Sequence, residues 1–302
     1  MSLPGRLLDV DGVRLFFYRS GDRAPNTFPK TGSCPLLLLH GYQLSHWQFR
    51  HVVPKLEAAG HEVIALDLPG HGESDRPAPE DYSYSAAAFL ETIVRFLGIL
   101  AVERVTVIGH SLGGGLALFL AARRAEHVDR IVVIDPLVYP FLPRAVATLA
   151  STPILAETVF SKLMSRWLIK HHLRQRIYAD PALATDDWVD YLWERVNRPG
   201  SVGAGLATLR LVAWPDVFSR FLPAVKARTL VLWGENDRMF PSTWAGRLAS
   251  GLERAESRII PCCGHSPAEE NPELVSQAIL EFLSAEKEDT RSPIGDHMRA
   301  TA

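Results

Sequence analysis

Short runs of apolar residues alternate with longer amphipathic stretches along most of the chain. The apolar runs carry Leu, Val and Ile almost without interruption, as strands buried on both faces do; they are residues 35–41, 62–70, 104–109, 130–135, 229–235 and 257–261. Stretches with helical periodicity lie between them, at residues 46–60, 85–100, 112–122, 243–252 and 272–286. This alternation predicts an α/β fold, with a mostly parallel sheet covered by helices on both faces.

Three segments depart from this alternation. Residues 6–19 form two alternating stretches around Asp11-Gly12, a strong hairpin signal that adds antiparallel strands at one edge of the sheet. Residues 136–224 are rich in helical patterns and aromatic side chains, and the strand pattern resumes after them. We therefore expect a core of residues 1–135 and 225–285 with an inserted helical subdomain. The polar, aperiodic residues 286–302 are expected to be a disordered tail.

Composition limits the cellular locations and the classes of binding partner to be expected for the protein. A formal net charge of −2 over 302 residues argues against nucleic-acid or anionic-membrane partners. The only cysteines, Cys34, Cys262 and Cys263, cannot form a disulfide framework in a chain of this length. The first residues lack a signal-peptide pattern, and no apolar run approaches the roughly 18 residues of a membrane span. We expect a cytoplasmic protein with a small-molecule substrate, and a homo-oligomer is left open.

Ser111 stands between two glycines where an apparent strand meets an apparent helix, in Gly109-His110-Ser111-Leu112-Gly113. A sharp strand-to-helix turn crowds its neighbours, so residues without a Cβ suit the two flanking positions. Such a turn lifts the serine hydroxyl out at the carboxyl end of the sheet, beside the positive end of the helix. A glycine-rich turn that only packs a helix on a sheet would give the same five residues, and this pattern alone is moderately specific.

A serine nucleophile needs a base, and the base needs an orienting carboxylate. Asp237 lies in the loop after the apolar run 229–235, and His265 follows the next run. The order serine, acid, histidine, each after a strand, is the order found in the fold in which this kind of serine turn occurs. Asp135, at the end of another run, is the rival acid, although Asp135 could simply end its strand before Pro136.

Two backbone N–H groups should hold the oxyanion of such a reaction. Leu112 directly follows the serine and supplies one, and Tyr42, after His40-Gly41, is the best placed residue for the other. The histidines match no zinc spacing, so neither a metal nor a cofactor is expected.

Together these segments resemble the α/β-hydrolase fold superfamily over nearly the whole core. The segments that carry the resemblance are HGYQLSHWQF, LDLPGHGESDRP, VIGHSLGGGLAL, VLWGENDRMFP and CCGHSPAEENPE. The resemblance implies Ser111 as nucleophile, Asp237 as acid and His265 as base. It also implies that residues 136–224 form a helical cap over the site.

Some relatives of this superfamily are excluded by the same segments. Dehalogenases and epoxide hydrolases of this fold use an aspartate nucleophile, whereas position 111 is serine. Lipases with a bulky oxyanion loop carry HGGG, whereas this chain has HGYQ. Residues 177–200 look similar to caps of carbon–carbon bond hydrolases, but those enzymes usually follow the histidine with tryptophan, and here Ser266-Pro267 follow.

The prediction is a serine hydrolase that cleaves a small, apolar or aromatic carboxylic ester through an acyl-enzyme. The aromatic residues of 136–224 suggest the apolar substrate, although aromatic side chains at helical spacing mostly pack their own subdomain. A carbon–carbon bond hydrolase of ring-fission products is the first alternative. A non-hydrolytic ligand receptor or cyclase on the same fold is the second, because a fold does not fix function.

Overall fold

The computed structural model describes residues 3–21, 34–141, 160, 162, 164–213 and 216–285. The sheet has eight strands, in the order β1-β2-β4-β3-β5-β6-β7-β8. Their bounds are β1 Arg6–Val10, β2 Val13–Arg19, β3 Leu36–Leu39, β4 Val63–Leu66, β5 Val105–His110, β6 Val128–Ile134, β7 Arg228–Gly234 and β8 Ala255–Ile260. Strand β2 pairs antiparallel with β1 and β4, and every later pairing is parallel. The predicted fold and its edge hairpin are confirmed.

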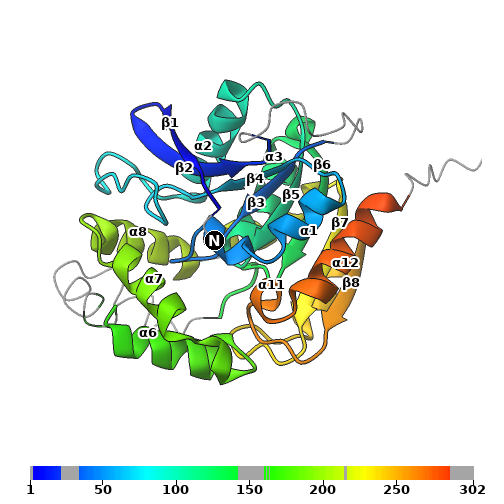
Figure 1. Ribbon diagram of the computed structural model, residues 1–302. Helices are drawn as coiled ribbons and strands as arrows, with labels where there is room; N and C mark the ends of the chain where they lie inside the picture. The colour runs from blue at the N-terminus through cyan, green and yellow to red at the C-terminus, as the bar shows by residue number, and fades with distance from the viewer. Residues whose placement is uncertain are drawn as a thin grey trace, which may run out of the picture.

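Helices cover both faces of the sheet (Figure 1). Those of the core are α1 Val53–Ala58, α2 Ala86–Ile99, α3 Leu112–Arg123, α10 Trp244–Ser250, α11 Pro267–Glu270 and α12 Pro272–Ser284. Short 3-10 turns, η1 His46–Phe49, η2 Ala125–His127 and η5 Leu222–Ala224, connect them. The stretch 46–60, predicted as one helix, is divided into η1 and α1 because Pro54 opens a new helix at its first turn.

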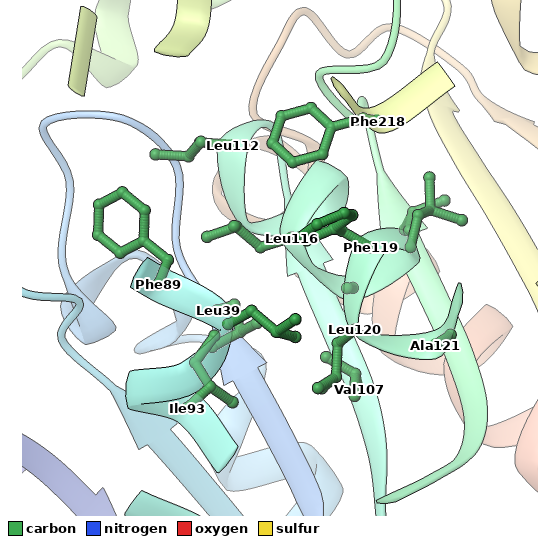
Figure 2. Close-up of a cluster of buried hydrophobic side chains, with 14 of the residues drawn as sticks. Leu39, Phe89, Ile93, Val107, Leu112, Leu116, Phe119, Leu120, Ala121 and Phe218 are labelled. Carbon is green, nitrogen blue, oxygen red and sulfur yellow. The ribbon is translucent and has the colours of Figure 1, made fainter. Parts of the chain in front are cut away.

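Successive residues of the inner parallel strands belong to two different hydrophobic clusters. Leu37 and Leu39 of β3 pack with α2 and α3, whereas Leu36 and Leu38 pack with α1 and α12. Figure 2 shows part of the first cluster, with Phe89 and Ile93 of α2 near Leu116 and Leu120 of α3. Because alternate side chains point to opposite faces of a strand, an uninterrupted apolar run is what a sheet covered on both faces requires.

Residues 136–224, as far as they are described, hold helices between β6 and β7. These are α6 Arg166–His172, the π-helical turn η3 Leu173–Ile177, the 3-10 turn η4 Pro181–Leu183, α7 Asp186–Val196, α8 Ser201–Ala213 and α9 Asp216–Ser219. Helices α6, α7 and α8 lie together, away from α2 and the β1–β2 hairpin (Figure 1). The division into core and cap stays a prediction, and the predicted disordered tail 286–302 lies outside the described residues. In the described part, no helix is long and apolar enough to cross a bilayer.

Candidate active site

Ser111 lies at the turn between β5 and α3, where its backbone has φ +50° and ψ −114°. Residues other than glycine seldom adopt this left-handed region, and such strain persists only where the surroundings impose it. The N–H of Ser111 donates to the carbonyl of Ile134 at 3.0 Å, and its carbonyl accepts from Leu137 at 2.8 Å. These bonds to β6 and the residues after it hold the turn in place.

The two glycines of the turn are required by close contacts. A Cβ at Gly109 would lie 2.3 Å from the carbonyl oxygen of Gly113, and a Cβ at Gly113 would lie 2.1 Å from that of Leu39. No side chain fits at such distances, so α3 approaches β3 and β5 only because both positions are glycine. The crowding expected from the sequence is present.

The structure brings Ser111, His265 and Asp237 together. The Oγ of Ser111 lies 3.1 Å from Nε2 of His265, and Nδ1 of the same ring lies 2.8 Å from Oδ2 of Asp237. Backbone N–H groups of Met239 and Phe240 donate to Oδ1 of Asp237 at 2.6 and 2.9 Å. Because a carboxylate accepts from Nδ1–H, Nε2 is left free to accept the serine proton.

Burial and hydrogen bonding set the charge of the acid. Burial disfavours the ionised form of Asp237, but its interaction with His265 and the two backbone donors outweigh burial and lower its pKa. The neighbouring His110 ring has its pKa lowered to about 3, chiefly by burial, so it is neutral beside His265. So weak a base does not compete with His265 for the proton of Ser111.

The loop that carries His265 is attached to the inserted helices. The N–H of His265 donates to the carbonyl of Ile177 at 2.7 Å. The carboxylate of Glu270 accepts from Gly264 at 2.8 Å, from Ser266 at 3.2 Å and from Ala179 at 2.7 Å. The loop and the end of η3 therefore share one set of hydrogen bonds.

A second carboxylate next to this loop, that of Glu269, accepts hydrogen bonds from side chains. Glu269 accepts from Tyr178 at 3.0 Å and from Ser266 at 2.9 Å, and it pairs with Arg50 at 2.7 Å. Sequence reasoning gave neither Glu269 nor Glu270 a role. The run Pro267-Ala268-Glu269-Glu270 places acidic residues after the histidine, but it does not indicate which residues their carboxylates contact.

Asp135, the rival acid, lies close to the pair but does not hydrogen-bond to the imidazole. Carboxylate oxygens of Asp135 and Asp237 and a ring nitrogen of His265 all lie within 4.8 Å of one another. Oδ1 of Asp135 accepts from the N–H of Gly234 at 2.9 Å, and Nδ1 of His265 is bonded to Asp237. The geometry therefore favours Asp237 as the orienting acid. These three groups could also hold a metal ion, so the expectation of no metal stays a prediction.

The two N–H groups predicted for the oxyanion are free in the described part of the chain, where neither donates to a protein acceptor. Leu112 is the first residue of α3, so its N–H has no partner within the helix. Tyr42 is fixed by its hydroxyl, which donates to the carbonyl of Gly205 in α8 at 2.9 Å. Both remain available to a substrate oxygen.

The basic run 170–176 in α6 and η3 lies mostly on a solvated face. Lys170 pairs with Asp186 at 2.7 Å, and the ring of His171 stacks on Trp167. Arg174 and Arg176 are exposed. The buried aromatics Tyr178 and Trp188 pack within the inserted helices, as most aromatic residues at helical spacing do.

The family is shown by a sequence-family profile described as the alpha/beta hydrolase fold, which matches residues 35–272. The chain therefore belongs to the alpha/beta hydrolase fold family, and it is a hydrolase. It is 26% identical to the uncharacterized hydrolase YugF of Bacillus subtilis, over 93% of this chain and 98% of that protein. It is 28% identical to a 2-hydroxymuconate semialdehyde hydrolase of a Pseudomonas species, over 93% and 94% of the two chains. The crystal structure of Cfl2 from Burkholderia cenocepacia is similar, with a TM-score of 0.78, 27% identity and coverage of 92% and 95%.

Proposed function

We propose that the protein is a serine hydrolase that cleaves a small, apolar or aromatic carboxylic ester through an acyl-enzyme. The proposal is carried by the chain of contacts from Ser111 through His265 to Asp237, at 3.1 and 2.8 Å. A serine next to an imidazole that a carboxylate orients is the arrangement that activates a hydroxyl as a nucleophile.

In the first half of the reaction, Nε2 of His265 takes the proton of Ser111 as Oγ attacks the ester carbonyl. Asp237 holds the ring in the tautomer with a proton on Nδ1 and stabilises the imidazolium that forms. The N–H groups of Tyr42 and Leu112 receive the negative charge that develops on the carbonyl oxygen. His265 then gives its proton to the leaving alcohol. In the second half, His265 activates a water molecule that releases the acid from Ser111.

The apolar nature of the substrate is supported by the side chains that pack beside Tyr42. Phe160 and Leu206 form a small buried cluster there, with Met164 and Leu209 packed against it. An apolar acyl or alcohol group would lose less hydration than a charged one beside these side chains.

The test is labelling and turnover by the purified protein. A fluorophosphonate probe should label the wild type at Ser111, and Ser111→Ala should abolish both labelling and hydrolysis of an aryl ester. Ser284→Ala, at an exposed serine on the end of α12, is the matched control and should keep both. Hydrolysis by Ser111→Ala at the wild-type rate would refute the proposal, and an unlabelled wild type would favour the receptor or cyclase.

Carbon–carbon bond hydrolysis is the second candidate, favoured by the resemblance to the Pseudomonas 2-hydroxymuconate semialdehyde hydrolase. Against it stands Ser266, which follows His265 and is bonded to Glu269. The two activities are separated by kcat/KM for a panel of aryl esters and for a vinylogous diketone of the ring-fission type. The ester proposal expects the higher value for an ester.

A further inference from the structure

Asp135 is a buried carboxyl group for which the reaction above has no use. It follows β6 directly, with φ +43° and no exposed surface. Oδ1 accepts the N–H of Gly234, but Oδ2 is buried without a hydrogen-bond partner in the described part of the protein. A buried carboxyl oxygen without a partner is costly, so its surroundings should explain it.

A second carboxylate, that of Asp237, lies close to Asp135. An oxygen of Asp135 lies within 4.8 Å of an oxygen of Asp237. Three donors already occupy Asp237, two on Oδ1 and His265 on Oδ2. A carboxylate has about four lone-pair positions, so one position on Asp237 is left for a further donor.

Two ionised carboxylates at this separation in a buried site repel each other strongly. The other titratable groups near Asp135 are His265, Glu270 and Cys263. Only His265 can carry a positive charge, and its Nδ1 is bonded to Asp237 and not to Asp135. Burial first, and then the charge of Asp237, raise the pKa of Asp135 well above its usual range. The repulsion is removed if Asp135 holds a proton, which also turns its free oxygen into a donor.

We propose that Asp135 is a neutral carboxylic acid in the folded protein and that its O–H donates to Asp237. It is then a positioning residue that acts on His265 through Asp237, so this inference extends the proposed function. The added hydrogen bond holds the carboxylate of Asp237 against the imidazole. It also spreads the charge of Asp237, which weakens the attraction of that carboxylate for the Nδ1 proton.

The first test does not depend on catalysis. Infrared spectra at neutral pH should contain a protonated-carboxyl band that disappears in Asp135→Asn. The difference spectrum isolates Asp135 from Glu270, whose pKa is also raised, chiefly by burial. Absence of the band from the difference spectrum between the wild type and Asp135→Asn would overturn the proposal.

The second test compares a variant that keeps the donor with one that lacks it. The amide of Asp135→Asn can donate to Asp237 and accept from Gly234, whereas Asp135→Ala can do neither. In Asp135→Ala the carboxylate of Asp237 attracts the Nδ1 proton more strongly, so we expect the resonance of that proton of His265 to move downfield. We also expect kcat to fall about tenfold with little change in KM, which is the effect of losing a hydrogen bond to a charged group. Asp135→Asn should restore the resonance and most of kcat.

The same resonance in both variants would mean that Asp135 only fills space, and would overturn the proposal. If Asp135→Ala does not fold, the infrared spectra and the resonance of Asp135→Asn decide. If the wild type hydrolyses no ester and binds no probe, the proposed function fails, but the infrared band and the resonance still decide the state of Asp135.

Discussion

Glu269 offers a direct test of how the histidine loop is held. Its side chain is only 4% exposed and accepts hydrogen bonds from Arg50, Tyr178 and Ser266. Trp188 in turn donates its indole N–H to the hydroxyl of Tyr178 at 2.7 Å. One carboxylate therefore joins η1, the inserted helices and the loop of His265.

Glu269→Ala removes the acceptor and leaves three donors without their partner. Breaking a buried ion pair by removing one member costs about 3–5 kcal/mol. The side chain of Arg50 is 19% exposed and regains some water, so we expect the lower end, about 3 kcal/mol. Glu269→Gln keeps one oxygen for Arg50, and its amide can donate to the hydroxyls of Tyr178 and Ser266. It loses only the charge, so we expect about 1.5 kcal/mol.

The assay is urea unfolding at equilibrium, followed by tryptophan fluorescence, with hydrogen exchange of residues 177–179 as a local readout. Glu273→Ala is the matched control, because Glu273 belongs to a neighbouring helix and its ion pair with Lys55 is exposed. It should leave both readouts at the wild-type values. The reasoning is refuted if Glu269→Ala unfolds within about 1 kcal/mol of the wild type, or if exchange at 177–179 is not faster in Glu269→Ala than in Glu273→Ala.

Two further substitutions test the packing and the charge of the site. A Cβ at Gly234 would lie 1.8 Å from the carbonyl oxygen of Gly264. Gly234→Ala should therefore displace the loop of His265 and slow fluorophosphonate labelling at least tenfold. Gly246→Ala, with open space around its Cβ, is the control and should be labelled at the wild-type rate. Because the pKa of Asp135 is raised, the folded protein keeps a proton that the unfolded chain loses above the ordinary carboxyl pKa. Between the ordinary and the raised pKa, the stability of the wild type should therefore fall by about 1.4 kcal/mol per pH unit relative to Asp135→Asn. A difference between the two proteins that stays constant over this pH range would contradict the raised pKa.

The fold was predictable because burial on both faces of the sheet leaves a direct mark on the sequence. Leu36–Leu39 is apolar at every position since successive residues face the two helical layers. The prediction of one continuous helix over 46–60 was wrong. Ser45 caps η1 through the N–H of Trp47, and α1 starts separately, with Pro54 in its first turn. Local capping competes with periodicity over such short stretches, so boundaries are less predictable than elements.

That the candidate site residues lie together was predictable from the order of the strands. Ser111, Asp237 and His265 each follow a strand, and parallel strands bring their carboxyl ends to one edge. Asp135 also follows a strand, so chain order alone left it as a rival to Asp237, which the resemblance favoured. The hydrogen bond to Nδ1 of His265 distinguishes the two acids. Glu269 was not predictable, because its partner Arg50 is 219 positions away and no local pattern joins them.

The inserted helices not only lie next to the candidate site but also hold its loops through hydrogen bonds. The His265 loop is bonded to Ile177, and the loop of Tyr42 is bonded to Gly205. A third bond joins Ser45, near the start of η1, to the hydroxyl of Tyr191 in α7 at 2.9 Å. Movement of these helices as one body would break the bonds to His265, the proposed base, and to Tyr42, the proposed second oxyanion donor. Access to Ser111 that preserves these hydrogen bonds therefore requires residues 177, 191 and 205 to stay in place. The same contacts thus position both the inserted helices and the candidate reacting groups.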